Sequence, residues 1–364
     1  MIIGVDANEA NVKERVGVST YAFNLLSFFK KKAEKNLRFK IFLKNQPQPD
    51  MPEEGRYFRY QVIKGRFFWS QIFLPWYLCQ KKDINVFFSP AHYIPRFCPV
   101  SSVVTIHDLS FIYYPQDFLK KDLYQLKTWT AYSVKKAKKI IAVSQSTKKD
   151  IIKIYKIPEE KIEVIYNGYE KPKTVTPSKF KIKKISCPYL LYVGTIQPRK
   201  NLSLLIDAFY KFNQIYNNYE LVIAGKKGWL YKKIFDKVSD LGIEDRVFFT
   251  DYVTDFQLAY LYQNAFCLVM PSLYEGFGIP LLEAMSFNCP VVSSFSSSLP
   301  EIGSDACLYF NPLDVNDLVE KLLKLKDNEK LRNELTKKGC QRIKFFSWNN
   351  CGEKTLSTII NSVK

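Results

Sequence analysis

Short apolar segments alternate with amphipathic helical segments along the whole chain, and the alternation occurs twice. This pattern is typical of a parallel sheet covered by helices on both faces, because parallel strands need a crossover connection. The strands expected in the first half are 2–6, 39–43, 86–89, 102–106, 139–143 and 162–165. Those expected in the second half are 189–193, 221–224, 247–249, 266–269 and 291–293. The pattern therefore predicts an α/β fold with two doubly wound domains.

Helical spacing of apolar residues predicts the connecting segments. The expected helices are 19–32, 145–154, 202–212, 258–263, 317–325, 328–338 and 349–363. Ser144 precedes one of them and is a good N-cap residue. Ligands of doubly wound sheets bind beyond the carboxyl ends of the strands, so residues that directly follow a strand are the candidates for a site.

A polar, basic segment with two prolines separates the two alternating regions. It covers residues 170–187 and has the composition of a linker. A chain of 364 residues is also too long for one ordinary domain. We expect an N-terminal domain over 1–169, the linker over 170–187, a C-terminal domain over 188–345 and a final helical segment over 346–364.

Bulk composition limits the class of protein. No run of about 18 apolar residues occurs, and the first residues read as a strand rather than a signal peptide, which predicts a cytoplasmic protein. The net charge of +19 indicates a polyanionic partner, either nucleic acid or an anionic membrane surface, or else reflects a lysine-rich genome. The eight scattered cysteines and two histidines predict buried free thiols and no metal site.

Two carboxylates flank a glycine-rich turn at residues 271–283. Glu275 lies in the turn, and Glu283 lies about one helical turn into the helix that Pro280 begins. The turn directs backbone N–H groups and the positive end of the helix dipole to one place, which suits a phosphate. The two acids would repel a phosphate and must instead face hydroxyl groups. A nucleotide-sugar, with ribose on one side and hexose on the other, has this chemistry.

Further candidates follow other strands. Arg199 and Lys200 follow the strand 189–193 and suit a diphosphate, although such a pair also occurs in solvated loops. His107 and Asp108 follow the strand 102–106. Gly17 precedes a helix, where glycine lets the backbone approach a phosphate closely.

Segments 194–202, 271–283, 290–294 and 299–306 together resemble the GT-B glycosyltransferases of family 4. The resemblance implies two Rossmann-like domains that face a central cleft, and a C-terminal helix that crosses back to the N-terminal domain. It also implies a retaining transferase that uses no metal and no cofactor. The nucleotide-sugar is then a substrate.

The resemblance assigns roles to individual residues. The catalytic residues would be His107, Arg199, Lys200 and Glu275. The donor-binding residues would be Gly17, Asp108, Tyr252, Val253, Phe277, Gly278, Ile279 and Glu283. The chain departs from the family pattern at Thr195, where some members carry arginine, at Gly17, which stands without a second glycine, and at Asp251, where glycine is more usual.

The segments 197–201 and 224–229 are similar to those of mannosyltransferases, so GDP-mannose is the first expected donor and a UDP-hexose the alternative. The expected acceptor is a polysaccharide or a lipid-linked glycan. Basic and aromatic residues mix at 56–69 and 111–139, which suits a peripheral position on the inner face of a membrane. Two other readings remain open: a basic nucleic-acid-binding protein, and a sugar-nucleotide epimerase of the same architecture.

Overall fold

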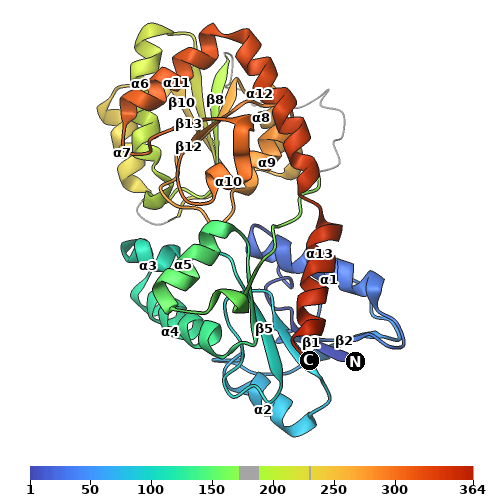
Figure 1. Cartoon of the computed structure of the whole chain (residues 1–364). Coiled ribbons are helices and arrows are strands. Elements are labelled where there is room, and N and C mark those ends of the chain that lie inside the picture. Colours follow the sequence, from blue (N-terminus) through green and yellow to red (C-terminus); the bar gives the residue numbers. More distant parts are fainter. Residues whose placement is uncertain (172–187, 229–230, 364) are drawn as a thin grey trace. The chain divides into compact units, whose positions relative to one another are not determined.

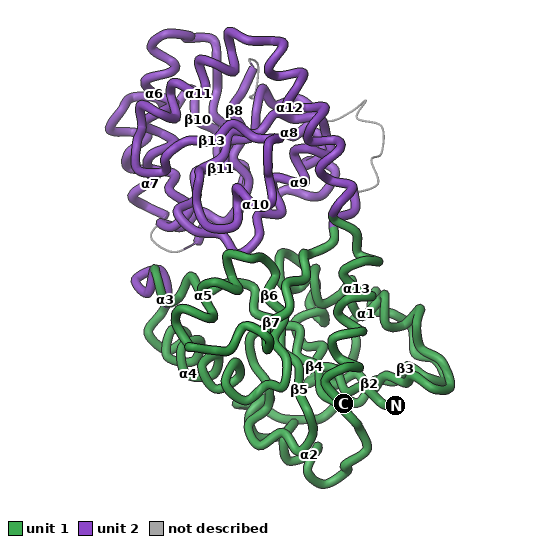
Figure 2. The backbone as a smooth tube through the Cα atoms, viewed as in Figure 1, with its two compact units in different colours: residues 1–113, 119–168, 346–364 green, residues 114–118, 169–345 purple. Residues whose placement is uncertain are grey.

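The computed structural model describes residues 1–171, 188–228 and 231–363. The chain forms two compact units (Figures 1 and 2). Unit 1 contains residues 1–113, 119–168 and 346–364, and unit 2 contains residues 114–118 and 169–345. The predicted linker lies outside the described residues from position 172 to position 187.

Unit 1 contains a parallel sheet of seven strands in the order β3-β2-β1-β4-β5-β6-β7. The strands are β1 (Ile2–Asp6), β2 (Arg38–Leu43), β3 (Phe58–Val62), β4 (Val86–Ser89), β5 (Ser101–Ile106), β6 (Lys139–Ala142) and β7 (Ile162–Val164). Six of them were predicted to within one residue at each end. The edge strand β3 was missed because its segment reads as a basic, aromatic surface. Phe58 is nevertheless fully buried and pairs with Phe39 of β2.

The C-terminal helix belongs to unit 1, as predicted. The helices of this unit are α1 (Val18–Lys32), α2 (Phe73–Lys81), α3 (Ser110–Tyr113), α4 (Lys120–Lys136), α5 (Gln145–Tyr155) and α13 (Trp348–Asn361). Helix α13 packs against α1 (Figure 1). The contact is close at Gly352, where a Cβ atom would lie 2.4 Å from the Phe28 ring. Ser144 caps α5 by accepting the Thr147 N–H at 3.1 Å.

Unit 2 contains a parallel sheet of six strands in the order β10-β9-β8-β11-β12-β13. The strands are β8 (Tyr189–Val193), β9 (Glu220–Ala224), β10 (Val247–Asp251), β11 (Cys267–Met270), β12 (Val291–Ser294) and β13 (Cys307–Phe310). The helices are α6 (Leu202–Ile215), α7 (Lys232–Asp240), α8 (Asp255–Asn264), α9 (Ile279–Ser286), α10 (Leu299–Gly303), α11 (Val315–Asp327) and α12 (Glu329–Arg342). The four-residue strand β13 and helix α7 were not predicted, although Ile234 and Val238 of α7 show helical spacing and are buried.

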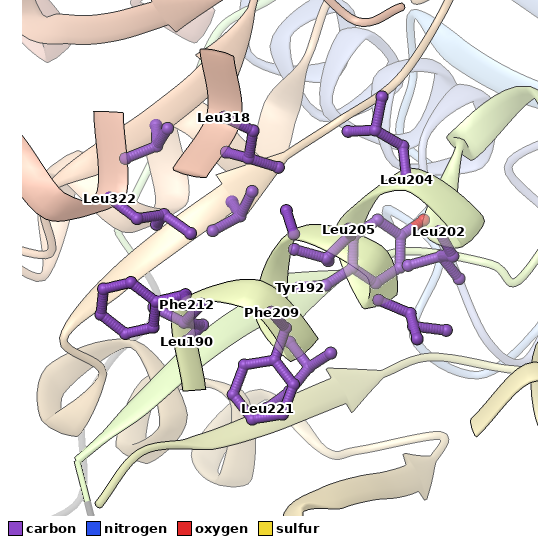
Figure 3. Packing of buried hydrophobic residues seen from close by; sticks show 14 of the residues in the cluster. Leu190, Tyr192, Leu202, Leu204, Leu205, Phe209, Phe212, Leu221, Leu318 and Leu322 are labelled. Atoms are coloured by element: carbon purple, nitrogen blue, oxygen red, sulfur yellow. The ribbon is translucent and has the colours of Figure 1, made fainter. Parts of the chain in front are cut away.

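The core of unit 2 holds its strands in place. Leu205 and Phe209 of α6 lie in one buried cluster with Leu190 of β8, Leu221 of β9 and Leu322 of α11 (Figure 3). Burying one such side chain contributes about 1.5–3 kcal/mol. Because β8, β11 and β12 are parallel neighbours in the sheet, the loops that follow them lie together beyond the carboxyl ends of these strands.

Two predictions from composition can be compared with the structure. Among the described residues, we find no helix whose length and apolar character would let it span a membrane. The described cysteines are free, but only Cys267, Cys289, Cys307 and Cys351 are buried. Cys79 is exposed, so the prediction of buried thiols was wrong for this residue.

Candidate active site

Three loops of unit 2 meet beyond the carboxyl ends of neighbouring strands. The first follows β8 and carries Arg199 and Lys200 into α6. The second follows β11 and carries Glu275 into α9. The third follows β12 and leads to α10. The Leu273 N–H donates to the Arg199 carbonyl oxygen at 2.9 Å, which joins the first two loops directly. The sequence placed these residues at strand ends, and the sheet order brings them together.

Glu275 is the centre of a nearly buried charged cluster. Lys200 Nζ lies 2.5 Å from Glu275 Oε1, and Arg199 Nη1 lies 3.8 Å from Glu275 Oε2. The Ser272 hydroxyl donates to Oε1 at 2.7 Å, and Arg199 Nη1 donates to the Tyr274 carbonyl oxygen at 3.2 Å. The cluster therefore contains two cations and one carboxylate.

The cations keep Glu275 ionised. Burial alone would raise the pKa of the Glu275 carboxyl, but the charges of Lys200 and Arg199 and the hydrogen bonds from Lys200 and Ser272 lower it below the usual 4.5. An ionised carboxylate accepts hydrogen bonds only, so Glu275 can receive hydroxyl protons of a sugar. The net charge of the three side chains is +1, which suits an anion beside the cluster.

Serine side chains fix the loop that carries Glu275. Ser298 Oγ donates to the carbonyl oxygens of Glu275 and Phe277 at 2.9 and 3.0 Å. Ser294 Oγ donates to the Ser272 carbonyl oxygen at 2.6 Å, and the Glu275 N–H donates to Ser297 Oγ at 2.7 Å. Sequence reasoning did not assign these roles. The available signal was the serine-rich segment 293–298, which covers the end of β12 and the loop that follows it.

We expect Ser298→Ala to reduce both stability and donor binding. The substitution leaves two buried carbonyl oxygens without the hydroxyl that now bonds them, and such a loss costs about 1–3 kcal/mol. Thermal unfolding and nucleotide titration of the variant would measure both effects. Ser357→Ala, on α13 of unit 1, is the control and should change neither quantity. Unchanged donor affinity in Ser298→Ala would show that the loop keeps its geometry without this hydroxyl.

The N-terminus of α9 offers backbone N–H groups to an anion. Gly278 is the N-cap residue with φ +103°, and a Cβ atom there would lie 2.7 Å from Leu299 Cδ2. Glycine is therefore required both by the left-handed backbone and by the close approach. In the described part of the chain, the N–H groups of Gly276 and Gly278 have no hydrogen-bond partner. Phe277 and Ile279 complete this turn, which was predicted as a phosphate site.

Glu283 lies within α9, as predicted, and the Tyr262 hydroxyl donates to its Oε2 at 2.8 Å. Burial raises the pKa of the Glu283 carboxyl to about 7, with a smaller opposing effect of the Tyr262 hydrogen bond and a further increase from Asp255. Near neutral pH, this carboxyl is thus close to its titration midpoint. Tyr262, on α8, is a second residue that the sequence did not reveal.

Tyr252 and Val253, which were predicted to lie beside the nucleotide base, directly follow β10. Asp251 has a left-handed backbone with φ 56°, which glycine adopts more easily. The exposed Tyr252 ring lies 4.6 Å from Lys226 Nζ. The structure does not bring Tyr252 or Val253 into hydrogen-bonding contact with the Glu275 cluster among the described residues.

The candidate residues of unit 1 lie where the sequence placed them. His107 follows β5, and its Nε2–H donates to the Pro90 carbonyl oxygen at 2.7 Å while the ring meets the edge of Tyr21. Burial is the main cause that lowers the pKa of His107 to about 4, and the neighbouring His92 also contributes to this decrease. The imidazole is therefore neutral at pH 7. Asp108 accepts the Ser110 N–H and hydroxyl at 2.9 and 2.7 Å. Gly17 is the N-cap residue of α1 with φ 50°.

Comparison with known proteins identifies the family of the chain. The model of the family "Glycosyltransferase Family 4" matches residues 17–171, and that of "Glycosyl transferases group 1" matches residues 177–342. The O-antigen chain mannosyltransferase B of Escherichia coli is 32% identical over 78% of this chain and 75% of its own length. The O-antigen chain mannosyltransferase RfbU of Salmonella typhimurium is 36% identical over 59% of this chain and 58% of its own length.

A solved structure supports the fold over the full length. The structure of Anabaena HepE in complex with UDP-glucose matches with a TM-score of 0.74 and 16% identity, and covers 99% of this chain and 100% of that one. At this identity, the match establishes the GT-B fold alone. Together with the two family models and the Escherichia coli relative, it shows that the chain belongs to the family 4, group 1 glycosyltransferases, with a GT-B fold.

Proposed function

We propose that the chain transfers a hexose, with retention, from a nucleotide-diphosphate sugar to a polysaccharide or lipid-linked glycan. The observation that carries the proposal is the cluster of Lys200, Arg199 and Glu275 in unit 2. Lys200 and Arg199 neutralise the charge that develops on the departing diphosphate, together with the N-terminus of α9. Preorganised charge of this kind typically lowers a barrier by several kcal/mol.

The two carboxylates bind opposite ends of the donor in this proposal. Glu275 accepts hydrogen bonds from the hexose hydroxyls, and Glu283 accepts those from the ribose. The retaining course follows from the resemblance to the family, in which the leaving phosphate takes the proton of the acceptor. The roles of His107, Asp108 and Gly17 in unit 1 remain predictions from the sequence.

Mannose is the first candidate for the transferred sugar. Both bacterial relatives described above are named O-antigen chain mannosyltransferases, and each is more than 30% identical to this chain. GDP-mannose is therefore the preferred donor. The alternative is a UDP-hexose, which is favoured by the UDP-glucose complex of the structurally similar HepE. A polymeric or lipid-linked glycan as acceptor agrees with the O-antigen chains in the names of the relatives.

A donor screen tests the proposal. Thermal unfolding would be followed with GDP, UDP, ADP and their common sugar conjugates, for the wild-type chain and for Glu283→Ala. A nucleotide at about a hundred times its dissociation constant adds about 2.7 kcal/mol of stability. We expect GDP and GDP-mannose to stabilise the wild-type chain and to have much less effect on the variant.

Product analysis then tests the chemistry. Slow hydrolysis of GDP-α-mannose, followed by NMR from the earliest time points, should release the α anomer of mannose before mutarotation. Stabilisation by UDP and UDP-hexoses instead of GDP would assign the alternative donor. The absence of any nucleotide effect on thermal unfolding would contradict the proposed donor site. Initial release of the β anomer would contradict the retaining course.

A further inference from the structure

Helix α2 of unit 1 carries apolar residues on two faces (Figure 1, light blue). Its inner face contributes the buried side chains Leu74 and Leu78 to the core. Its outer face carries Ile72, Trp76 and Cys79, which are spaced by four and three residues and therefore lie on one side of a helix. Ile72 is 55% exposed and Trp76 is 63% exposed. A short helix that is apolar on both sides exposes a surface that water does not favour.

The outer face of α2 continues into the loop before β5. Cys79 Sγ lies 3.8 Å from the Phe97 carbonyl oxygen, and the Phe97 side chain is 82% exposed. The Phe97 N–H donates to the Tyr132 hydroxyl of α4 at 3.1 Å, which fixes the loop between the two helices. We call Ile72, Trp76, Cys79 and Phe97 the apolar stripe.

A basic pocket of about 780 Å³ adjoins the stripe. It is lined by Phe97, by the end of α4, by the segments before and at the start of β5, by the residues before β6, and by Ser362 and Val363 after α13. Lys136 and Lys138 lie in its wall, are exposed, and make no ion pair with any side chain that the structure describes. Lys161 donates to the carbonyl oxygens of Val134 and Lys135 at 3.0 and 2.7 Å, and none of the lining residues is acidic.

The pocket lies apart from the candidate residues of unit 1. Ser101 and Ser102 begin β5 and line the pocket, whereas His107 follows the end of the same strand. The pocket therefore opens at the amino ends of the strands, and the residues predicted to bind the donor lie at the carboxyl ends. A ligand in this pocket would not compete with the proposed chemistry.

Exposed aromatic and aliphatic side chains fit the surface of an anionic bilayer when they lie beside lysines such as these, which have no ion pair among the described residues. Aromatic rings enter the boundary between headgroups and acyl chains, and lysines attract the phosphate groups of the lipids. Charge complementarity favours this occupant over a second copy of the chain, because a net charge of +19 makes two copies repel each other. A nucleic acid would leave the aliphatic Ile72 without a stacking partner.

We propose that the apolar stripe inserts into an anionic membrane surface and that the basic pocket receives a lipid phosphate headgroup. The inference identifies the membrane partner of the proposed function and its contact residues, and it does not depend on the donor. The basic pocket overlaps the stretch 111–139 expected from the sequence through Lys136 and Lys138, and the apolar stripe lies outside both expected stretches. Within the stretches 56–69 and 111–139, Phe58, Trp69 and Phe111 are buried, whereas Phe67 and Tyr124 are exposed.

Vesicle sedimentation tests the proposal. The full chain would be mixed with vesicles of phosphatidylcholine alone and with vesicles that also contain phosphatidylglycerol. We expect binding to the anionic vesicles only, and a loss of affinity of at least about tenfold in Trp76→Ala/Phe97→Ala. Lys136→Gln/Lys138→Gln should lose roughly thirtyfold. Binding should also weaken as salt is added.

Matched controls separate the stripe and the pocket from general effects. Leu313→Ala removes an exposed side chain of unit 2, and Lys330→Gln/Lys337→Gln removes two exposed lysines of α12, so both should bind like the wild-type chain. Equal losses in the controls would overturn the proposal, as would unchanged binding in the Trp76/Phe97 variant. Donor-induced thermal stabilisation should be unchanged in every variant, so failure of this proposal is distinguishable from failure of the donor site.

Two further arms exclude other occupants. Light scattering of the protein without vesicles should show no dimer that depends on the apolar stripe. A dimer that dissociates when Trp76→Ala/Phe97→Ala is introduced would assign the stripe to a second copy of the chain. Inorganic phosphate at constant ionic strength should stabilise the protein only weakly through Lys136 and Lys138, because a free ion makes no contact with the apolar stripe. Stabilisation by phosphate without any vesicle binding would assign the pocket to a small anion and overturn the proposal.

Discussion

Replacing Lys200 by methionine is expected to reduce donor turnover by about a hundredfold to a thousandfold. The residue is one of two cations beside Glu275, and the proposed reaction needs both to balance the charge of the departing diphosphate. Methionine fills a similar volume without the charge, so the packing around the site should be retained. Steady-state release of nucleotide from the donor would measure the loss. Lys337→Met, on the exposed surface of α12, is the control and should retain full activity.

The same substitution should weaken the pH dependence that Glu275 gives to stability. In the wild-type chain, the pKa of Glu275 is lowered, so its ionisation stabilises the fold above pH 4.5 and this contribution is lost as the pH falls. Without Lys200, burial is opposed only by Arg199 and the Ser272 hydrogen bond, so the pKa should rise relative to the wild-type chain and the stabilisation by ionised Glu275 should shrink. Breaking a buried ion pair typically costs about 3–5 kcal/mol. The difference in thermal stability between the two proteins should therefore be larger at pH 7 than at pH 4.

A double-mutant cycle with Glu275→Gln shows whether the two residues act together. Because Lys200 Nζ and Glu275 Oε1 are 2.5 Å apart, we expect the combined loss of turnover to be clearly smaller than the product of the single losses. Fully multiplicative losses would mean that Lys200 acts on the diphosphate without help from Glu275. A Lys200→Met variant with near wild-type turnover would remove Lys200 from the proposed mechanism.

Most strands of the two sheets could be predicted from the sequence because buried parallel strands are continuous apolar runs. β1, β4 and β8 have the predicted bounds. The edge strand β3 could not be recognised because only its first residue, Phe58, is buried, and the alternation that marks a half-buried strand is obscured by arginine and tyrosine. β13 was missed because it has four residues, of which only the first and last are buried.

The positions of the charged residues could be predicted, but their partners could not. Arg199 and Glu275 lie in loops that follow strands, and the rule that ligands bind at the carboxyl ends of strands selected them together with the resemblance to the family. Ser298 bonds the Glu275 carbonyl oxygen across 23 residues, and Tyr262 bonds Glu283 across 21 residues. Such contacts depend on the order of the strands in the sheet, which local sequence patterns do not encode.

Glu283→Gln is expected to stabilise the ligand-free protein at alkaline pH while it weakens donor binding. The pKa of Glu283 is raised by burial from 4.5 to about 7, so its contribution to stability is fully present below pH 4.5 and is lost as the pH rises through about 7. The shift corresponds to a cost of about 3 kcal/mol once the carboxyl is ionised. Glutamine has a similar shape, can accept the Tyr262 hydrogen bond, and carries no charge.

The wild-type chain and Glu283→Gln should therefore have similar melting temperatures near pH 4.5, and Glu283→Gln should melt several degrees higher than the wild-type chain at pH 8. For donor affinity, the proposed ribose contact predicts that the wild-type chain binds more tightly than Glu283→Gln, because two hydroxyls bond a carboxylate more strongly than an amide. Wild-type affinity for the nucleotide should rise between pH 6 and pH 8, and that of Glu283→Gln should not. Glu53→Gln removes an exposed charge outside the helices of unit 1 and should match the wild-type chain in both measurements. A gain of stability in Glu283→Gln without any loss of affinity would confine Glu283 to a structural role and assign the ribose to another group.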